Sequence, residues 1–511
     1  MRKLSVGKIA CILPLFCLFI TIASPAQTFT TLFTFDGNTN GQGANAPLLQ
    51  ATDGNFYGTT GLGGADDFGG IFGLTPGGEL TSLSMFTNCP NCPKQSSAGL
   101  IQGPDEILYG TALGGAYASG SVFEIAPNGL LTTLYSFCAQ LSCPDGQYPS
   151  SLVYGPNGNL YGTAAYGGTG RFCTAFQLKP VLCGTIFEMT PTGQLTTLYN
   201  FCSQSGCSDG IYPVPLMLAA DGKLYGATTS GGNAKGDCKE FGCGSIFVIT
   251  SPGNLTTLHR FCSVINAQGF CTDGEDPGNA LIQGSDGNFY GTTKTGGANN
   301  GGTIFRMTPA GKLSTLYNFC SLANCLDGTL PYAGLVEGTD GNFYGTTAEG
   351  GANNNTAVCF GSGCGTIFKF SRTGQLTTLY NFCSQTNCAD GTSPVGSLVQ
   401  ATDGEFYGSA IQGGNSNCRF GCGTIFSLSV GLGPFVEPSL QFGKVGSSIN
   451  IMGNNLKGTT SVMFNGTHAT FIVESGTFIK ATVPVGATTG RIEVTTQNET
   501  LSSNVLFHVL P

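Results

Sequence analysis

Short runs of β-branched and aromatic residues, separated by glycine, proline, asparagine and aspartate, follow one another along most of this 511-residue chain. Three motifs recur seven times each: one built around Tyr-Gly-Thr-Thr, one of the form Gly-Thr-Ile-Phe, and one of the form Thr-Thr-Leu-Tyr-Asn-Phe. The tyrosines of the first motif are Tyr57, Tyr109, Tyr161, Tyr225, Tyr290, Tyr344 and Tyr407. Self-similarity of this kind is typical of repeat architectures.

Each repeat predicts four short strands, which in one copy cover 281–283, 288–293, 302–305 and 313–319. Asp-Gly or Asn-Gly dipeptides follow the first strand and Pro-x-Gly triplets follow the third, so both connections are tight turns. Four antiparallel strands per unit is the pattern of a propeller blade. With 80 glycines and 24 prolines, the chain cannot form a helical bundle. Tyrosines such as Tyr290 and Tyr344 are expected to pack between blades.

The order of the motifs predicts how the two ends of the repeat region meet. Residues 29–35 carry a fourth-strand motif with no first three strands before it, and the last unit, near 397–428, lacks a fourth strand. Pairing 29–35 with the strand around Phe426 completes that unit and removes free sheet edges. The sequence therefore predicts an all-β fold with a seven-bladed β-propeller over 27–430, closed by the N-terminal strand. A β-solenoid is the alternative, but it gains nothing from the matched deficit.

A second domain follows the repeats. The cysteines stop after Cys422, and a Gly-Pro linker at 431–434 opens a segment of different character. Alternating strands such as 448–452, separated by Asn-Gly and Gly-Thr turns, are enough for a sandwich of about seven strands. We expect an immunoglobulin-like β-sandwich over 431–511.

The first 26 residues have the pattern of a signal peptide. Basic residues precede an apolar run from Ile9 to Ile22, and Ser24-Pro25-Ala26 is a small-x-small cleavage pattern. The formal net charge of −9 becomes −12 when the three basic residues of this segment leave, which disfavours nucleic acid as a partner. No later apolar run is long enough for a membrane span. The sequence predicts a secreted or cell-surface protein.

Cysteine usage agrees with export. Cys11 and Cys17 lie in the predicted signal peptide, and the other 20 of the 22 cysteines fall into ten close pairs, which favours local disulfides. The predicted pairs are Cys89/Cys92, Cys138/Cys143, Cys173/Cys183, Cys202/Cys207, Cys238/Cys243, Cys262/Cys271, Cys320/Cys325, Cys359/Cys364, Cys383/Cys388 and Cys418/Cys422. Zinc or redox chemistry at Cys89 and Cys92 is the alternative, but no neighbouring His or second CxxC completes a zinc site.

Length variation and cysteine pairs concentrate in two connections of each repeat, between the second and third strands and between the fourth strand and the next repeat. Both connections emerge on one face of the predicted propeller. Loops on a rigid scaffold commonly carry binding, and staples that stiffen them lower the ordering cost of recognition. The alternative is that the staples only protect glycine-rich loops from proteolysis.

Candidate ligand-binding residues on that face are acidic or aromatic. An Asp-Gly recurs after the fourth strand, at Asp36, Asp145, Asp209, Asp273, Asp327 and Asp390. These carboxylates either form an anionic ring for calcium or polar sugars, or cap their own turns. Aromatic candidates near the long loops are Tyr117, Tyr148, Tyr166, Tyr212 and Tyr332. We select Asp145, Asp209, Asp273, Asp327, Asp390, Tyr148, Tyr212 and Tyr332 as the ligand-binding set. No catalytic residue, metal ligand or cofactor is assigned, with calcium left as an alternative.

Histidine is nearly absent, which disfavours hydrolytic triads and His-rich metal sites. Only His259 lies in the repeats, where it replaces a motif tyrosine and is expected to be a half-buried strand residue. Three functions remain open: an exported, non-enzymatic binding or adhesion protein for a glycan or a protein; a propeller enzyme of the lyase or lactonase type; and a purely structural surface or matrix protein. Near-identical repeats disfavour the enzyme, because catalysis needs unique residues at one point.

Two resemblances fit these expectations. The repeat reading LIQGSDGNFYGTT, followed by GGTIF and LSTLYNF, resembles the Gloeo/Verruco (GloVer) tandem repeat of exported bacterial proteins over 28–430. The tail resembles an IPT/TIG immunoglobulin-like domain, with matches that include Gly446, Ile449, Gly453 and the Phe464-Asn465-Gly466 run. The first resemblance implies a propeller shape without an assigned chemistry. The second implies a spacer or interaction module, and therefore adhesion or presentation.

Overall fold

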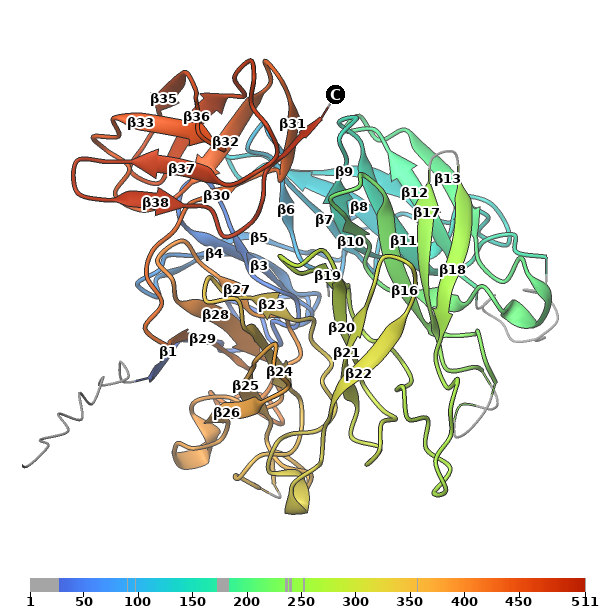
Figure 1. Ribbon diagram of the computed structural model, residues 1–511. Helices are drawn as coiled ribbons and strands as arrows, with labels where there is room; N and C mark the ends of the chain where they lie inside the picture. The colour runs from blue at the N-terminus through green and yellow to red at the C-terminus, as the bar shows by residue number, and fades with distance from the viewer. Residues whose placement is uncertain are drawn as a thin grey trace, which may run out of the picture.

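The computed structural model describes residues 27–89, 91–96, 98–171, 183–234, 238, 241–250, 253–355 and 357–510. It is all-β and is built from short antiparallel strands (Figure 1). Its named 3-10 turns are η2 (Ser205–Cys207), η4 (Ala323–Cys325) and η5 (Thr386–Cys388). The predicted signal peptide lies outside the described residues.

The repeat region forms seven sheets in the part of the chain that the structure describes, numbered here in chain order. Sheet 1 contains β2 (Leu49–Gln50), β3 (Phe56–Thr60), β4 (Gly70–Leu74) and β5 (Leu80–Met85). Sheet 2 contains β6 (Ile101–Gln102), β7 (Leu108–Ala112), β8 (Ser121–Ile125) and β9 (Leu131–Ser136). Sheet 3 contains β10 (Gln147–Tyr154), β11 (Leu160–Tyr166), β12 (Thr185–Met189) and β13 (Leu195–Asn200).

The next sheets repeat this order. Sheet 4 contains β14 (Ile211–Pro213), β15 (Met217–Leu218), β16 (Leu224–Ser230), β17 (Ser245–Thr250) and β18 (Asn254–Arg260). Sheet 5 contains β19 (Ile282–Gln283), β20 (Phe289–Thr293), β21 (Thr303–Met307) and β22 (Leu313–Asn318). Sheet 6 contains β23 (Val336–Glu337), β24 (Phe343–Thr347), β25 (Thr366–Phe370) and β26 (Leu376–Asn381).

Sheet 7 combines the two ends of the repeat region. It contains β27 (Val399–Gln400), β28 (Phe406–Ala410), β29 (Thr424–Ser429) and, as its fourth strand, β1 (Thr28–Thr34), which lies beside β29 in Figure 1. Thr31 is paired with Phe426, as the sequence predicts. The register shifts between Thr31 and Phe33, at the motif position where strands β5, β9, β13, β18, β22 and β26 also carry a bulge. The first strand of the chain therefore has the geometry of a fourth strand.

The recurring Tyr-Gly pair has two structural causes. The glycine lies over the phenylalanine of the next strand: a Cβ on Gly291 would lie 2.6 Å from Cζ of Phe305, so no side chain fits there. The tyrosine packs against a neighbouring sheet, as expected, and Tyr290 and Phe343 have ring centroids 4.2 Å apart. The ring of Tyr407 lies 4.1 Å from that of Phe56, so the same contact joins sheet 7 to sheet 1.

Side-chain oxygens of glutamine or glutamate also connect neighbouring sheets at the end of the first strand. The backbone N–H of Thr339 donates to Oε1 of Gln400 in the following sheet (2.9 Å), and Thr402 donates in the same way to Gln50 of sheet 1 (2.9 Å). Equivalent bonds join Thr52 to Gln102, Ala220 to Gln283 and Ser285 to Glu337. Proline, which has no N–H, occupies the donor position at Pro104 and Pro156. In the sheet that follows Pro104, Tyr154 replaces the acceptor glutamine, and in the sheet that follows Pro156, Leu218 replaces it. The donor and the acceptor are therefore lost together.

The tail forms a sandwich with its own core. One sheet has the order β30 (Glu437–Pro438), β32 (Ser448–Met452), β36 (Phe478–Thr482), β35 (Phe471–Val473), and another has β34 (Thr467–His468), β33 (Ser461–Phe464), β37 (Ile492–Thr495), β38 (Thr500–Ser502). Strands β31 (Phe442–Lys444) and β39 (His508–Leu510) pair in parallel. The core includes Ile451, Val462, Ile479 and Val494, which are fully buried. The described tail thus has more strands than the sequence predicted.

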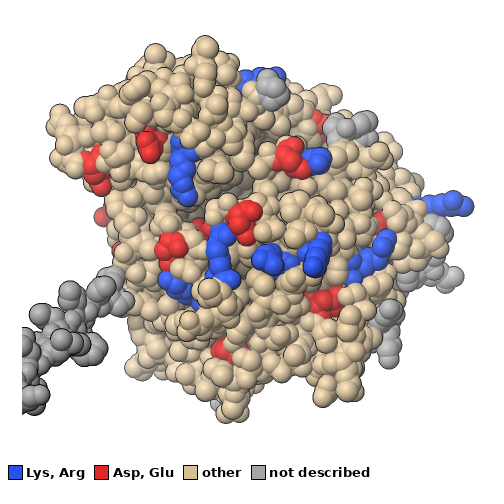
Figure 2. All heavy atoms as spheres, in the orientation of Figure 1, with Lys and Arg blue, Asp and Glu red and all other residues tan. Residues whose placement is uncertain are grey.

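Charged side chains are sparse on the surface, as Figure 2 shows for one face, where Lys and Arg are interspersed with Asp and Glu on a largely uncharged background. Arg372, for example, pairs with Glu337 and, at 3.4 Å, with Asp286. None of the helices among the described residues has the length and hydropathy to cross a bilayer.

Candidate functional site

The repeat sheets have two unlike faces. We call the face formed by the short β2–β3 and β4–β5 type turns the turn face, and the face formed by the longer β3–β4 and β5–β6 type connections the loop face. The tail lies on the turn face: Oγ1 of Thr477 donates to the carbonyl of Thr52 (2.8 Å), and Nδ2 of Asn454 donates to Oγ1 of Thr402 (3.1 Å). Figure 1 shows this tail stacked over the blue sheets. Because the tail covers part of the turn face, a ligand has freer access to the loop face.

The recurring aspartates on the loop face cap their own loops. In the loop that follows sheet 6, Oδ2 of Asp390 accepts from the hydroxyl of Tyr380 (2.7 Å) and the backbone N–H of Ser384 (2.9 Å), while Oδ1 accepts from the N–H of Gln385 (3.2 Å). Asp145, Asp209 and Asp327 accept from Tyr135, Tyr199 and Tyr317 in the same way. Asp209, Asp327 and Asp390 are almost completely buried. This geometry fits the turn-capping interpretation and leaves these carboxylates little surface for calcium or another ligand.

His259 takes the tyrosine's place in one sheet. Its Nε2 lies 3.0 Å from Oδ2 of Asp273, and its side chain is half-buried, as expected from the motif. Burial opposes ionisation of Asp273, but hydrogen bonds from His259 and Ser263 outweigh it and hold the pKa of this carboxyl below its usual value. The contact with His259 therefore stabilises the loop that carries Asp273.

Asp36 sits in the one such loop that has an aspartate but no cysteine pair. Its Oδ1 accepts from the backbone N–H groups of Asn38 and Thr39, both at 2.8 Å. A Cβ on Gly37 would lie 2.5 Å from Sγ of Cys418, so glycine lets this loop pack against a disulfide of the last repeat.

Nine of the ten predicted cysteine pairs are disulfides among the residues that the structure describes. They are Cys89–Cys92, Cys138–Cys143, Cys202–Cys207, Cys238–Cys243, Cys262–Cys271, Cys320–Cys325, Cys359–Cys364, Cys383–Cys388 and Cys418–Cys422. Cys183 is also disulfide-bonded, and its predicted partner, Cys173, lies outside the described residues.

Cys143 shows how one of the predicted disulfides is placed within its loop. The Cys138–Cys143 bond is present, but Cys143 is buried, with 8% of the residue exposed, and its φ is 47°. Its carbonyl accepts from the backbone N–H groups of Gly146 (3.0 Å) and Gly168 (2.9 Å), which lie on the two loop-face connections of sheet 3. These bonds draw Cys143 inward beneath the exposed tip at Leu141, so it holds the loop from inside and offers a ligand almost no surface.

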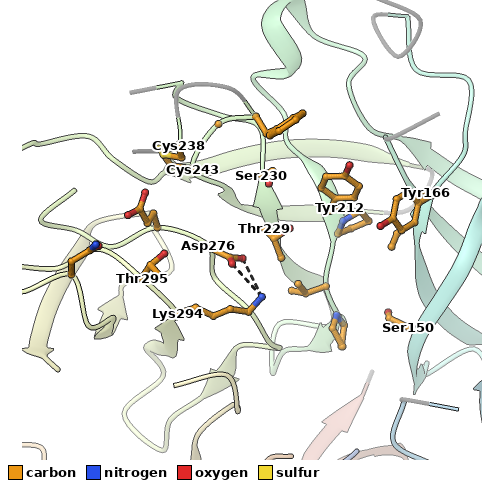
Figure 3. A pocket seen from close by; sticks show the side chains of 18 residues that line it. Ser150, Tyr166, Tyr212, Thr229, Ser230, Cys238, Cys243, Asp276, Lys294 and Thr295 are labelled. Atoms are coloured by element: carbon orange, nitrogen blue, oxygen red, sulfur yellow. Dashed lines mark hydrogen bonds and ion pairs between the residues drawn. A yellow bond between two sulfur atoms is a disulfide. The ribbon is translucent and has the colours of Figure 1, made fainter. Parts of the chain in front are cut away.

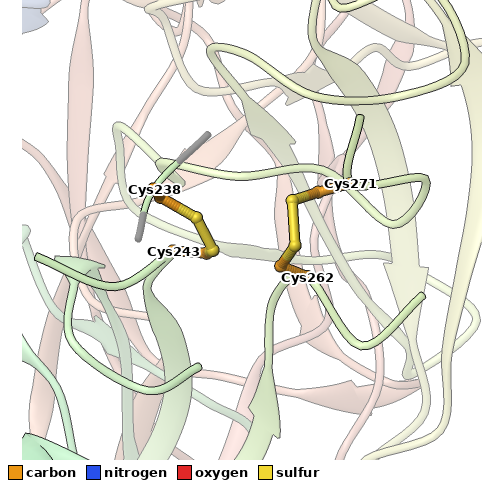
Figure 4. Close-up of side chains that lie close together, drawn as sticks. All are labelled: Cys238, Cys243, Cys262 and Cys271. Atoms are coloured by element: carbon orange, nitrogen blue, oxygen red, sulfur yellow. A yellow bond between two sulfur atoms is a disulfide. The ribbon is translucent and has the colours of Figure 1, made fainter. Parts of the chain in front are cut away.

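Two staples of sheet 4 lie together. The sulfur atoms of Cys238, Cys243, Cys262 and Cys271 are all within 4.8 Å of one another (Figure 4). Bonded sulfurs offer no thiolate to a metal. Each disulfide closes one loop-face connection of sheet 4, and the two bonds lie close to each other.

A pocket of about 780 Å³ opens on the loop face between sheets 3, 4 and 5 (Figure 3). Its lining combines aromatic rings, hydroxyl groups and an ion pair; it includes Ser150, Tyr166, Tyr212, Thr229, Ser230, Phe241, Asp276, Lys294 and Asn300. The Cys238–Cys243 disulfide forms part of the wall. The volume lies within the range of small-molecule sites.

Three tyrosines form one side of this region. The ring of Tyr166, at the end of β11, lies 5.4 Å from Tyr148 and 5.1 Å from Tyr212, edge to face in both cases. Burial, and then the neighbouring Tyr166, raise the pKa of Tyr212 to about 12. Tyr212 is therefore a neutral hydrogen-bonding group over the physiological pH range.

The opposite side is formed by an ion pair. Nζ of Lys294, which follows β20, lies 3.2 Å from Oδ2 of Asp276, and the same ammonium lies 5.0 Å from the ring centroid of Tyr332. Burial raises the pKa of Tyr332, and the charges of Asp276 and Glu349 add to this rise. The lysine is thus held between a carboxylate and an aromatic ring.

The structure brings four of the five aromatic candidates of the sequence to one region: Tyr166 and Tyr212 line the pocket, Tyr148 packs on its wall, and Tyr332 contacts its lysine. The fifth, Tyr117, does not line the pocket. The candidate aspartates instead serve their loops. Sequence reasoning did not select Asp276 and Lys294 for the site. Asp276 occupies the slot that holds Tyr148 and Tyr212 in the two preceding repeats, and this correspondence was the available signal.

Comparisons with known proteins give distant structural likenesses. One is to a structural-genomics target described provisionally as a gluconolactonase, with a TM-score of 0.33, 11% identity, and coverage of 57% of this chain and 81% of that chain. Another is to a structural-genomics protein of unknown function from Bacteroides thetaiotaomicron VPI-5482, with a TM-score of 0.35, 12% identity, and coverage of 79% and 96%. Neither likeness is close enough to carry an argument. No curated protein matches the chain in sequence.

Family models match both parts of the chain. The IPT/TIG domain matches residues 436–509, within the tail. The Gloeobacter/Verrucomicrobia repeat matches residues 18–182 and 181–359, which is more than half of the chain. The chain therefore belongs to the Gloeobacter/Verrucomicrobia repeat family and has an IPT/TIG domain over residues 436–509.

Proposed function

We propose that this protein is an exported, non-enzymatic recognition protein that binds carbohydrate in the loop-face pocket of sheets 3, 4 and 5. The observation that carries the proposal is the wall of this pocket, where Tyr166 and Tyr212 stand beside hydroxyl and amide side chains. A sugar presents an apolar ring face and a rim of hydroxyls, so it needs both kinds of contact. Aromatic rings with polar groups at their edge supply both.

The proposed scaffold is a closed seven-bladed propeller over 27–430, followed by an immunoglobulin-like domain. The contacts between sheet 7 and sheet 1 support it, because they repeat contacts found between consecutive sheets: the Gln50–Thr402 bond and the Phe56–Tyr407 stacking. The β1–β29 pairing supports it as well, since it joins the two ends of the repeat region. A closed ring holds the pocket walls at fixed distances, and such preorganisation lowers the cost of binding.

Export is part of the proposal. The disulfides on the loop face are typical of proteins that fold in an oxidising compartment. Residues 1–26 supply the signal peptide that this location requires. The IPT/TIG match favours a surface-exposed protein, whose tail presents the loop face to its ligand.

A protein partner is the second candidate ligand. Several tips of the loop-face connections carry exposed apolar side chains, with 98% of Leu141 and 63% of Phe360 accessible to solvent. Apolar groups on an exposed face are typical of protein interaction sites. These tips are separate residues from those that line the pocket, so mutation distinguishes the two candidates.

The test is binding of the purified, oxidised mature chain to a panel of glycans and polysaccharides. We expect saturable binding that Tyr166→Ala weakens by roughly tenfold or more, as loss of a buried aromatic anchor does. Tyr117→Ala is the matched control, because Tyr117 is an exposed loop tyrosine that does not line the pocket. Absence of saturable glycan binding, or equal losses in the two variants, would refute the pocket as a carbohydrate site.

A further inference from the structure

One backbone position on the loop face is the same in every repeat sheet while its side chain differs. It is the residue two positions after the glycine of the Asp-Gly turn, or its equivalent in sheets 1 and 2, and φ there is between 53° and 66°. In chain order the position is occupied by Gly43, Gln95, Tyr148, Tyr212, Asp276, Leu330 and Ser393. A positive φ is unfavourable for bulky residues, so a non-glycine side chain is kept there at a cost in free energy.

Backbone hydrogen bonds fix this position without using the side chain. The N–H of Tyr212 donates to the carbonyl of Cys183 (3.1 Å), and the N–H of Asp276 donates to the carbonyl of Cys243 (3.1 Å), in each case on a loop of the preceding sheet. The carbonyl of Asp276 accepts from the N–H of Lys294 (3.0 Å) at the end of the second strand of its own sheet. The N–H of Gly43 makes the corresponding bond to the carbonyl of Cys422, so a glycine at this position keeps the backbone hydrogen bond.

The backbone bonds therefore do not restrict which side chain occupies this position. In sheets 4 and 5 the side chain lines the pocket. Tyr212 and Asp276 both line it, together with their strand-end neighbours Thr229 and Lys294. Strained non-glycine residues concentrate at functional sites, where the side chain repays the conformational cost. The same position in sheet 7, Ser393, does not line the pocket.

The charges of the pocket determine which saccharides fit. Lys294 is the one cation among the described lining residues, and it is already paired with Asp276 at 3.2 Å. The buried carboxyl of Glu275 adds a further acid to the same wall. A uronate, sulfate or phosphate group approaching Lys294 would also approach the Asp276 carboxylate that is paired with it, which disfavours anionic ligands at this wall.

Resting on the proposed carbohydrate function, we propose that Tyr212 and Asp276 are specificity-determining residues and that the ligand is an uncharged saccharide chain. Tyr212 packs against the apolar face of a sugar ring. The Asp276 carboxylate accepts hydrogen bonds from sugar hydroxyls, and the Lys294 ammonium donates hydrogen bonds to them. An uncharged sugar can therefore bind this ion pair through hydrogen bonds alone.

The test compares glycine substitutions at equivalent backbone positions, Tyr212→Gly and Ser393→Gly, in the full mature chain. Both relieve the same positive φ. The probes are cellopentaose, xylopentaose, maltopentaose and mannopentaose as neutral chains, and pentagalacturonate as the anionic chain. We expect the neutral probe that binds best to lose about thirtyfold or more in affinity with Tyr212→Gly, the loss typical of a removed aromatic anchor, and to bind Ser393→Gly like the wild type. Pentagalacturonate is expected to bind more weakly than every neutral chain that binds.

Each outcome bears on a different claim. If a neutral chain binds and Tyr212→Gly binds it like the wild type, the role of Tyr212 is wrong while the carbohydrate function stands. If pentagalacturonate binds as tightly as the neutral chains, the uncharged ligand class is wrong. If no saccharide binds, the proposed function itself fails. Should Tyr212→Gly not fold, Tyr212→Asn takes its place, because asparagine tolerates a positive φ.

Discussion

At the scale of single residues, the loop face depends on buried carboxylates. Asp390 accepts hydrogen bonds from one tyrosine hydroxyl and two backbone N–H groups, and it is inaccessible to solvent. Hydrogen bonds to a buried charge are worth more than neutral ones. The aspartate thereby anchors the loop that follows β26, and the Cys383–Cys388 disulfide closes the same loop.

Asp390→Asn tests this role. The amide keeps the size of the side chain but turns one acceptor oxygen into a donor that faces existing donors. We expect the free energy of unfolding to fall by about 2 to 3 kcal/mol, measured by urea denaturation. Asp36→Asn is the control, because the Asp36 loop is more exposed, and its loss should stay below about 1 kcal/mol. Similar losses in both variants would contradict the structural role of the buried carboxylate.

Residue-level prediction from the sequence worked where a side chain acts within its own repeat. The tight Asp-Gly turns after the first strand, the half-buried His259 and the inter-sheet Tyr290 all follow from the motif in which each residue lies. The loop-face aspartates, such as Asp327, are selected from the sequence as ligand-binding residues, but they accept hydrogen bonds within their own loops. The spacing of the cysteines likewise predicted the partner of Cys143, but its burial depends on bonds to two separate loops. The Asp276–Lys294 pair did not follow either. It depends on a positive φ at Asp276 and on the β-bridge between Glu275 and Thr295, which belong to different motifs.

At the scale of strands and turns, neighbouring sheets are joined by a donor–acceptor pair that the sequence either keeps or loses as a whole. The N–H of Ala220 donates to Oε1 of Gln283 at 2.8 Å. One sheet earlier, Pro156 removes the donor and Leu218 replaces the acceptor. An unpaired N–H or amide at such a contact would cost free energy, which explains why both partners change.

A double-mutant cycle at this contact gives an element-scale prediction. Gln283→Leu alone leaves the Ala220 N–H without its acceptor and should lower the free energy of unfolding by about 1 kcal/mol. In an Ala220→Pro background the same substitution should cost close to nothing, because the donor is already absent. The measurement is the urea midpoint of the four proteins. Additive losses across the cycle would show that the bond does not link these sheets.

At the scale of the whole molecule, the tail and the pocket lie on opposite faces of the repeat sheets. Thr477 and Asn454 fasten the tail to turns of sheets 1 and 7, and Nδ2 of Asn450 reaches the carbonyl of Pro104 in sheet 2 (3.5 Å). The repeat order and the linker allowed the two folds to be predicted from the sequence. The docking of one on the other could not be, because it rests on scattered polar contacts that carry no sequence motif.

The central claim is that the loop-face pocket is where the protein recognises a saccharide. Hydrogen–deuterium exchange of the full mature chain, with and without the saccharide that binds best, tests it most directly, since a bound ligand protects the backbone that it covers or rigidifies. The account predicts slower exchange around the pocket-lining residues Ser150, 212–215, 275–276 and 294–295, with no change at the turn-face segments 52–55 and 104–106. Protection on the turn face or the tail, with none at the pocket, would contradict it.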